Sequence, residues 1–214
     1  MQLPFTHEQF LEVFGAYNTA VWPVAVLLWL ATAGVVLAFY RRGAEVSRAL
    51  TVLLAVHWAW SGGVYHLIYF RAINPAAVLF GTLFIIEAVI LAWLGLGSQR
   101  LRFSASTGWA RVGALLVVYA LAYPGLGLLF GLEYPRLPLF GVPCPTTILT
   151  AGVLLCAPPR QVRWVAVIPL LWAAVGGSAA FVLAIRTDLA LVVAGIVLLA
   201  YIARPSGRDR LRAA

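Results

Sequence analysis

Three ionisable side chains interrupt long apolar stretches, where a charge is costly and usually functional. They are His57 and His66 in one apolar segment and Glu87 in the next. Counted from the same end of the two segments, His57 lies about 12 Å deep and Glu87 about 13 Å deep. Antiparallel neighbours would place the imidazole beside the carboxyl group, as a proton-relay, substrate-binding or acid–base pair. The alternative is a buried structural pair that locks the two segments together.

Other polar side chains extend this candidate site. Ser61 and Tyr65 follow His57 at intervals of four residues, on the same face of a helix. His66 and Cys144 each lie four residues from the predicted outer end of their segment, so both are about 6 Å below that boundary. With Glu133 they could form a soft-metal site, because thiolate, imidazole and carboxylate groups all bind metals. The alternative for Cys144 is an inert buried side chain.

The run Pro143–Thr147 places Pro-Cys-Pro-Thr-Thr at the start of an apolar segment. Proline removes a backbone donor and clashes with the preceding turn. We therefore expect a helix break whose carbonyls face a cavity, together with the hydroxyls of Thr146 and Thr147. Tyr123, followed by a proline, indicates a second break. Interrupted helices are typical of transporter binding sites, and the alternative is that the small residues and prolines serve close helix packing.

The composition indicates which elements must position these residues. Of the 214 residues, 63% are hydrophobic and 10% are charged, whereas a soluble domain carries about 25% charged residues. We therefore predict an all-α integral membrane protein, a single polytopic domain over residues 1–214 with the lipid bilayer as its partner. The net charge of +8 is not arranged as a basic stripe, which argues against nucleic acid. No motif indicates a cofactor.

Seven apolar segments approach the roughly 20 residues that cross a bilayer, which predicts a seven-transmembrane-helix bundle. The fifth and seventh are short, so one of them could be partly re-entrant. The spans cover approximately residues 20–40, 49–70, 75–96, 109–132, 140–157, 162–185 and 189–203.

The distribution of arginine predicts the orientation, because basic residues concentrate in cytoplasmic connections. One side of the predicted bundle holds Arg71, Arg136 and Arg186, mixed with Glu8, Glu12, Glu133 and Asp188. We therefore expect the N-terminus outside and the C-terminus in the cytoplasm. The other side holds Arg41, Arg42, Arg48, Arg100, Arg102, Arg111, Arg160, Arg163, Arg204, Arg208, Arg210 and Arg212.

The first residues predict a short interfacial helix on the outer surface, over about residues 6–17. Thr6 followed by Gln9 forms a capping-box pattern that would start this helix. An apolar stripe would then lie at the membrane interface. The stripe consists of Phe10, Leu11, Phe14 and Tyr17.

Specific motifs occur along nearly the whole chain. They are Leu3-Pro4-Phe5-Thr6, Ala16-Tyr17-Asn18, Val21-Trp22-Pro23, the segment from Trp58 to His66, Ile73-Asn74-Pro75-Ala76-Ala77, the run from Phe140 to Thr147, Ile168-Pro169-Leu170-Leu171-Trp172 and Gly176-Gly177-Ser178-Ala179-Ala180. In these motifs the chain resembles a bacterial membrane-protein family known as domain of unknown function 6064. The resemblance implies a small integral membrane protein and assigns no catalytic residue.

These observations lead us to expect a multi-pass protein of the bacterial cytoplasmic (inner) membrane. Its first candidate function is binding or transport of a small solute or ion, through a cavity near the Pro143–Thr147 run. The second is a membrane-embedded enzyme that uses His57 and Glu87 as an acid–base pair. The third is an accessory or structural subunit of a membrane complex. The chain could form a homo-oligomer, and purification as a stable monomer or homo-oligomer would argue against the third function.

Overall fold

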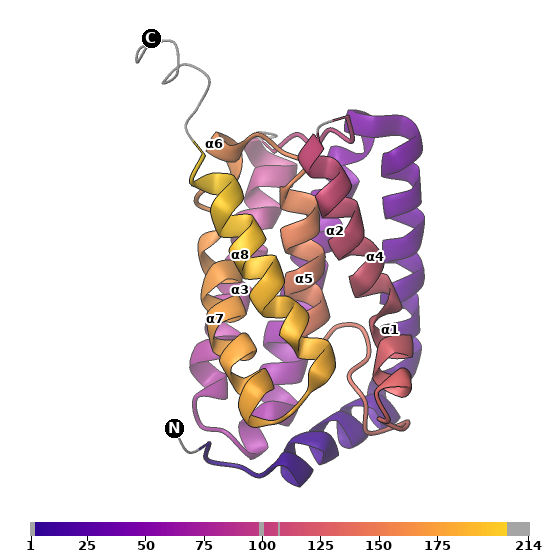
Figure 1. Cartoon of the computed structure of the whole chain (residues 1–214), viewed down its shortest axis with the longest axis vertical. Coiled ribbons are helices and arrows are strands. Elements are labelled where there is room, and N and C mark those ends of the chain that lie inside the picture. The colour runs from indigo at the N-terminus through magenta and orange to yellow at the C-terminus, as the bar shows by residue number, and fades with distance from the viewer. Residues whose placement is uncertain (1–2, 99–100, 107, 205–214) are drawn as a thin grey trace.

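The computed structural model describes residues 3–98, 101–106 and 108–204, and within these ranges the chain forms helices and no strand. Each of the seven predicted apolar segments coincides with a helix. The helices lie side by side in one bundle (Figure 1). In chain order they are α1 (His7–Arg42), α2 (Ser47–Trp60), α3 (Ala77–Ala92), α4 (Gly108–Leu129), α5 (Pro143–Leu154), α6 (Pro159–Val162), α7 (Val167–Val182) and α8 (Ala190–Ile202).

Two helices continue as wider, π-helical turns. After α2 the chain runs on through Ser61–Tyr69 and a 3-10 turn at Phe70–Ala72, and after α3 it continues through Trp93–Ser98. π-Helical turns are frequent at functional sites. Because each such turn holds more residues than an α-helical one, the faces predicted from a 3.6-residue repeat are rotated beyond Ser61.

The first helix begins as predicted and runs further than predicted. Thr6 Oγ1 accepts a hydrogen bond from the Gln9 amide, and Gln9 Oε1 accepts one from the Thr6 amide, which confirms the capping box. The interfacial helix and the first span, predicted as separate, form one helix that contains Pro23. Figure 1 shows the first part of α1 running obliquely under the bundle and the rest running up its side.

The apolar stripe of α1 is buried, but its partner differs from the predicted one. The stripe packs against the end of the helix bundle, in a cluster that includes Tyr65 and Phe70, so the prediction of a membrane-interface contact for this stripe was wrong. The reason is that the helices leave an apolar end that α1 covers. The buried stripe residues are Phe10, Leu11, Phe14 and Tyr17.

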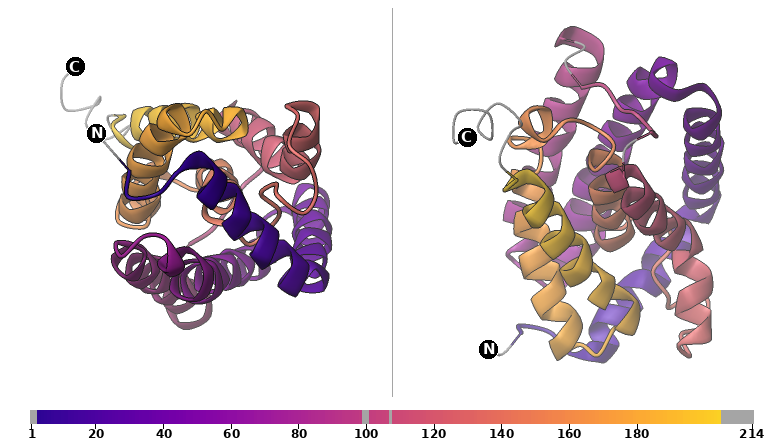
Figure 2. Two further views of the ribbon diagram at one scale, coloured as in Figure 1. Left: turned by 90° about the horizontal axis from the view of Figure 1, so that it is seen from below. Right: turned by 45° about the horizontal axis from the view of Figure 1, so that its top comes forward.

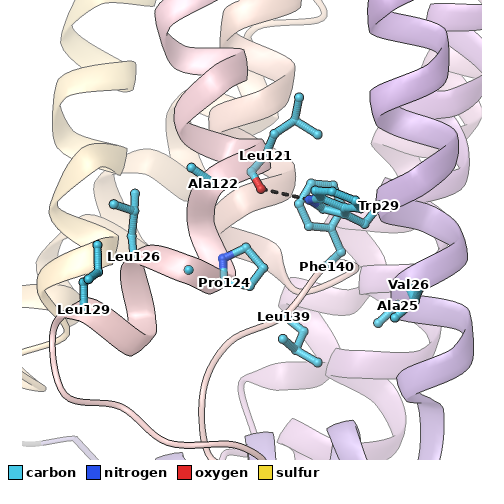
Figure 3. Close-up of a pocket in the computed structure, with 11 residues that line it drawn as sticks. Ala25, Val26, Trp29, Leu121, Ala122, Pro124, Leu126, Leu129, Leu139 and Phe140 are labelled. Atoms are coloured by element: carbon cyan, nitrogen blue, oxygen red, sulfur yellow. Dashed lines mark hydrogen bonds between the residues drawn. The ribbon is translucent and has the colours of Figure 1, made fainter.

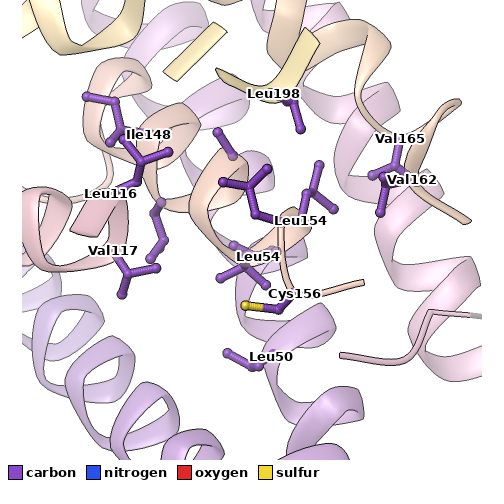
Figure 4. Packing of buried hydrophobic residues seen from close by; sticks show 14 of the residues in the cluster. Leu50, Leu54, Leu116, Val117, Ile148, Leu154, Cys156, Val162, Val165 and Leu198 are labelled. Atoms are coloured by element: carbon purple, nitrogen blue, oxygen red, sulfur yellow. The ribbon is translucent and has the colours of Figure 1, made fainter. Parts of the chain in front are cut away.

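The short helix α5 lies at the centre of the bundle. All of its residues are buried, and it contacts α2, α4, α7 and α8. Figure 2 (left) shows α5 inside a ring formed by the other helices. Figure 4 shows the side chains packed in this core, among them Leu54 of α2, Leu116 of α4 and Leu198 of α8. Its 12 residues extend about 18 Å, which is less than the roughly 30 Å of a bilayer core.

The chain reaches α5 through a non-helical segment, residues 130–142, whose second half is mostly buried. Backbone groups in an apolar interior need hydrogen-bond partners. Asn18 Nδ2 donates to the carbonyl oxygens of Pro135 and Leu137, at 2.6 Å each. The Tyr17 hydroxyl donates to the Phe140 carbonyl at 3.2 Å, and Trp60 Nε1 donates to that hydroxyl at 2.7 Å.

These contacts, from Tyr17 and Asn18 with Trp60 behind them, are called the α1 clamp below. They hold the entry to α5 against α1. The side chains of the clamp therefore donate the hydrogen bonds that these carbonyl groups would receive from backbone amides in a helix.

Glycines allow the closest approaches around α5. A Cβ at Gly113 would lie 2.3 Å from the carbonyl oxygen of Gly152, so α4 and α5 meet backbone to backbone, a contact that small residues permit between membrane helices. Gly141 has a φ of 81°. A Cβ there would lie 2.6 Å from Trp60 and 2.7 Å from the Tyr17 hydroxyl, so both the backbone conformation and the clamp require glycine.

The outside of the bundle is apolar. Large side chains such as Leu79, Leu115, Leu129 and Phe181 are more than half exposed, which is rare over a whole surface in soluble proteins. Within the described residues, three helical stretches are long and apolar enough to cross a membrane: 7–72, 77–98 and 108–129. The first of these folds back at Gly43 between α1 and α2 (Figure 1). These features are those of a membrane protein.

The α1 clamp predicts that Gly141→Ala destabilises the protein. A non-glycine residue at this φ and the added contact with Trp60 together cost about 2–5 kcal/mol. We expect a thermal midpoint in detergent that is several degrees lower, measured by intrinsic fluorescence. Gly34→Ala is the matched control, because a Cβ there meets no atom within 4 Å, and it should leave the midpoint unchanged or raise it. Equal midpoints for the two variants would contradict the role given to Gly141.

Candidate functional site

A cavity of about 250 Å³ lies at the end of the bundle where α1 begins. The first part of α1 lines it through Phe10 and Phe14. Figure 2 (left) shows this part of α1 crossing the end of the bundle. Its walls also come from the π-helical turn after α2, from the starts of α3 and α5, and from α7. The aromatic side chains that line it are Phe5, Phe10, Phe14, Tyr65, Phe70, Phe80 and Trp172.

A few polar groups converge on these aromatic walls. Tyr65 and Cys144, both predicted as ligand-binding residues, line the cavity together with Asp188. Asp188 and Cys144 both lie near enough to Tyr65 to interact with it electrostatically. A mostly apolar pocket with a few convergent polar groups is the usual form of a small-molecule site.

Asp188 is the residue that the sequence reasoning missed. It lies in the turn Arg186–Leu189 before α8, is 3% exposed, and its Oδ1 has no hydrogen-bond partner among the described residues. Burial raises the pKa of Asp188 to about 8. The distribution of charges predicts Asp188 on the outer side of the bundle, and the structure buries its side chain. The apolar stripe of α1 was the one signal that this end could be covered.

The Pro143–Thr147 run begins a helix and does not break one, so that prediction was wrong. Pro143 is the first residue of α5, where a missing backbone N–H removes no helical hydrogen bond. The Thr147 hydroxyl donates to the Pro143 carbonyl at 2.9 Å. Thr146 is buried outside the cavity wall, and its hydroxyl has no partner within the described chain. The run thus supplies Cys144 to the cavity.

The predicted metal site is not formed. His66 and Cys144 are buried, whereas Glu133 is exposed in the segment before α5. Among the described residues, no group of three or more His, Cys, Asp or Glu side chains could hold a metal ion. His66 makes other contacts: its Nδ1 donates to the Ser61 carbonyl at 2.9 Å, and its ring packs edge-on against Trp172.

The predicted His57–Glu87 pair does not form a hydrogen bond or an ion pair in the described structure. Gly62 abuts Gly81 and Trp58 packs on Phe84, so the antiparallel register does place the two residues at similar depth. The side chains differ in direction: His57 lies 2.8 Å from the Thr32 hydroxyl of α1. Depth can be counted along a sequence, but the direction of a side chain cannot. Here Trp58, the residue after His57, packs on Phe84 of α3, so His57 points elsewhere.

Glu87 is fully buried, and neither carboxyl oxygen has a partner among the residues described. The hydroxyls of Ser61 and Tyr123 are likewise buried and unpartnered in the described chain. None of these three residues lines the cavity. The structure therefore brings together Tyr65 and Cys144 from the predicted set, and it leaves Glu87 as a separate buried carboxyl.

A larger groove of about 570 Å³ lies between α1 and α4. Figure 3 shows its apolar lining and the hydrogen bond of 2.8 Å that Trp29 Nε1 donates to the Leu121 carbonyl. The predicted break after Tyr123 is absent, because α4 passes through Pro124 as one helix. Tyr123 packs into the core and does not line the groove. With no ionisable side chain in its lining, this groove resembles a lipid-facing crevice more than a chemical site.

Comparison with known proteins gives the family and nothing more specific. A family model described as "Family of unknown function (DUF6064)" matches residues 7–213, which confirms the resemblance found in the motifs. No curated protein and no solved structure matches the chain.

The raised pKa of Asp188 predicts how stability depends on pH. Asp188 titrates near 3.8 when exposed and near 8 when folded, so the unfolded chain releases a proton that the folded chain keeps. The free energy of unfolding should therefore fall as the pH rises from about 4 to about 8. Asp188→Asn removes this contribution, and its thermal midpoint should fall less over that range than the midpoint of the unsubstituted protein. Parallel midpoint curves would show that Asp188 is not buried.

Proposed function

The chain belongs to a family of unknown function, and we propose that it binds and transports a small solute through the cavity beneath α1. The observation that carries this proposal is the buried side chain of Asp188 on the wall of a largely aromatic cavity, where its Oδ1 has no hydrogen-bond partner among the described residues. Carboxyl groups inside an apolar protein are costly, and they usually mark a substrate or ion pathway.

The size and lining of the cavity support a small ligand. Its volume of about 250 Å³ is just below the range of roughly 300–1,000 Å³ found for drug-sized ligands. Two further features suit transport. The π-helical turn after α2 and the short helix α5 are irregular elements, and membrane transporters build their sites from such elements.

The competing functions have less support. An acid–base enzyme that used His57 and Glu87 would need the two side chains within hydrogen-bond reach, and His57 instead lies against Thr32. A purely structural subunit would have no use for an unpartnered carboxyl group on a cavity wall. Solute binding accounts for both Asp188 and the cavity.

We further propose a seven-span topology in the bacterial cytoplasmic membrane, with the N-terminus outside. The spans are α1, α2, α3, α4, α5 with its non-helical entry segment, α7 and α8. The uneven distribution of arginine between the two ends supports this orientation. It places the cavity and α1's first turns at the outer face, where a solute would arrive.

A reporter fused after Ala214 tests the topology. We expect a fluorescent protein there to be bright and alkaline phosphatase to be inactive, because the C-terminus is cytoplasmic. The converse pair of fusions before Met1, with a leader for export, should give active phosphatase. An active phosphatase at Ala214 would contradict the proposed topology, because an outside N-terminus and an odd number of spans cannot both hold with an outside C-terminus.

Access of a small molecule to the cavity tests the proposed function. In a Cys156→Ala background, methyl methanethiosulfonate should modify Cys144 in proteoliposomes, as measured by mass spectrometry of the intact protein. Ala179→Phe adds an aromatic ring at the cavity wall and should slow this reaction about tenfold or more, since a large ring there takes up free volume that the reagent needs. Ala174→Phe is the matched control, because Ala174 lies exposed on the same helix. Equal rates in the two variants would contradict the proposal.

A further inference from the structure

We propose that the ligand of this cavity is a small organic cation, an alkylammonium or quaternary ammonium ion, held by Asp188 and the surrounding aromatic rings. This inference rests on the solute-binding function proposed above and specifies the chemical class of the solute.

The charge of the cavity wall is the first argument. Asp188 is the one carboxyl group among the described residues that line the cavity, and no Arg, Lys or His is among them. Arg186, in the same turn, is exposed, and no ion pair joins it to Asp188 in the described structure. The wall can therefore balance a positive charge and has nothing to balance a negative one.

The carboxyl group also has no structural task that would explain its burial. A carboxylate just before a helix commonly caps its N-terminus, but no side chain caps the start of α8. Oδ1 of Asp188 remains without a partner within the described residues. A buried carboxylate that is neither paired nor hydrogen-bonded is costly. A ligand cation is therefore the partner that the charged form of Asp188 lacks.

The aromatic lining is the second, independent argument. The faces of Phe, Tyr and Trp rings attract cations, and aromatic cages are the usual sites for quaternary ammonium groups. Here Phe10 and Phe14 come from α1, Tyr65 from the turn after α2, and Trp172 from α7. Rings thus surround the cavity from several elements. A hydrophobic cation would gain cation–π contacts without needing the hydration that an inorganic ion requires.

Binding of such a cation would displace a proton. The other titratable groups that face Asp188 are Tyr65 of the π-helical turn, Cys144 of α5 and Tyr119 of α4, and all three are neutral near pH 7. Burial raises the pKa of Asp188 to about 8, so the empty site holds a proton. One monovalent cation enters as one proton leaves the carboxyl group, and the charge of the site is unchanged. This exchange would couple solute binding to a proton gradient.

Charged thiol reagents test the inference directly, because Cys144 lines the same cavity. In the Cys156→Ala background, the rates of Cys144 modification are measured with trimethylammonioethyl methanethiosulfonate, a cation, and sulfonatoethyl methanethiosulfonate, an anion. We expect the cation to react about tenfold faster or more, which corresponds to a free-energy difference of about 1.4 kcal/mol or more between the two reagents at the site. The ratio of the two rates should rise between pH 6 and pH 9, because Asp188 loses its proton over this range. The ionisation of the Cys144 thiol affects both rates equally and therefore cancels in the ratio.

Asp188→Asn should abolish most of this preference and leave the rate with neutral methyl methanethiosulfonate unchanged, which also shows that the variant is folded. Tetraethylammonium should protect Cys144 from the neutral reagent in the parent protein and protect it less in Asp188→Asn. If the neutral reagent reaches Cys144 but the cation has no advantage in the parent protein, the cation inference is overturned and the cavity remains a solute site. If no reagent reaches Cys144, both proposals fail.

Discussion

A non-helical backbone inside an apolar bundle must find hydrogen-bond partners, and the structure depends on how this chain meets that requirement. Asn18 and Tyr17 donate to three carbonyl groups in the segment that leads to α5. An amide group that satisfies two carbonyls at once is well suited to an interior without water. Trp60 holds the Tyr17 hydroxyl in place from α2, so the α1 clamp joins three parts of the chain.

The clamp determines where α5 begins and therefore what surrounds it. Because the chain enters through a non-helical segment of turns and bends, Pro143 starts the helix inside the bundle, and Cys144 lines the cavity at the end where α1 begins. The same part of α1 that carries the clamp also carries Phe10 and Phe14, which close the cavity. One stretch of helix thus supplies partners to a buried backbone and lines the cavity on whose wall Asp188 lies.

The sequence predicts the helices well because apolar runs and a capping box act locally. It predicts the candidate site only in part, because contacts between helices depend on their rotation. His57 and Glu87 were placed at the same depth, and the direction of each side chain could not be known without the packing of Trp58. Asp188 could not be found at all, since its burial depends on how the turn Arg186–Leu189 packs against α4, α7 and α8.

The α1 clamp itself is tested most directly by hydrogen exchange of the segment 135–142 in the membrane-reconstituted protein. The account predicts slow exchange of these amides in the natural sequence, and faster exchange in Asn18→Leu with the amides of α3 and α8 unchanged. Fast exchange of this segment in the natural sequence, or no change in Asn18→Leu, would contradict the central role of the clamp.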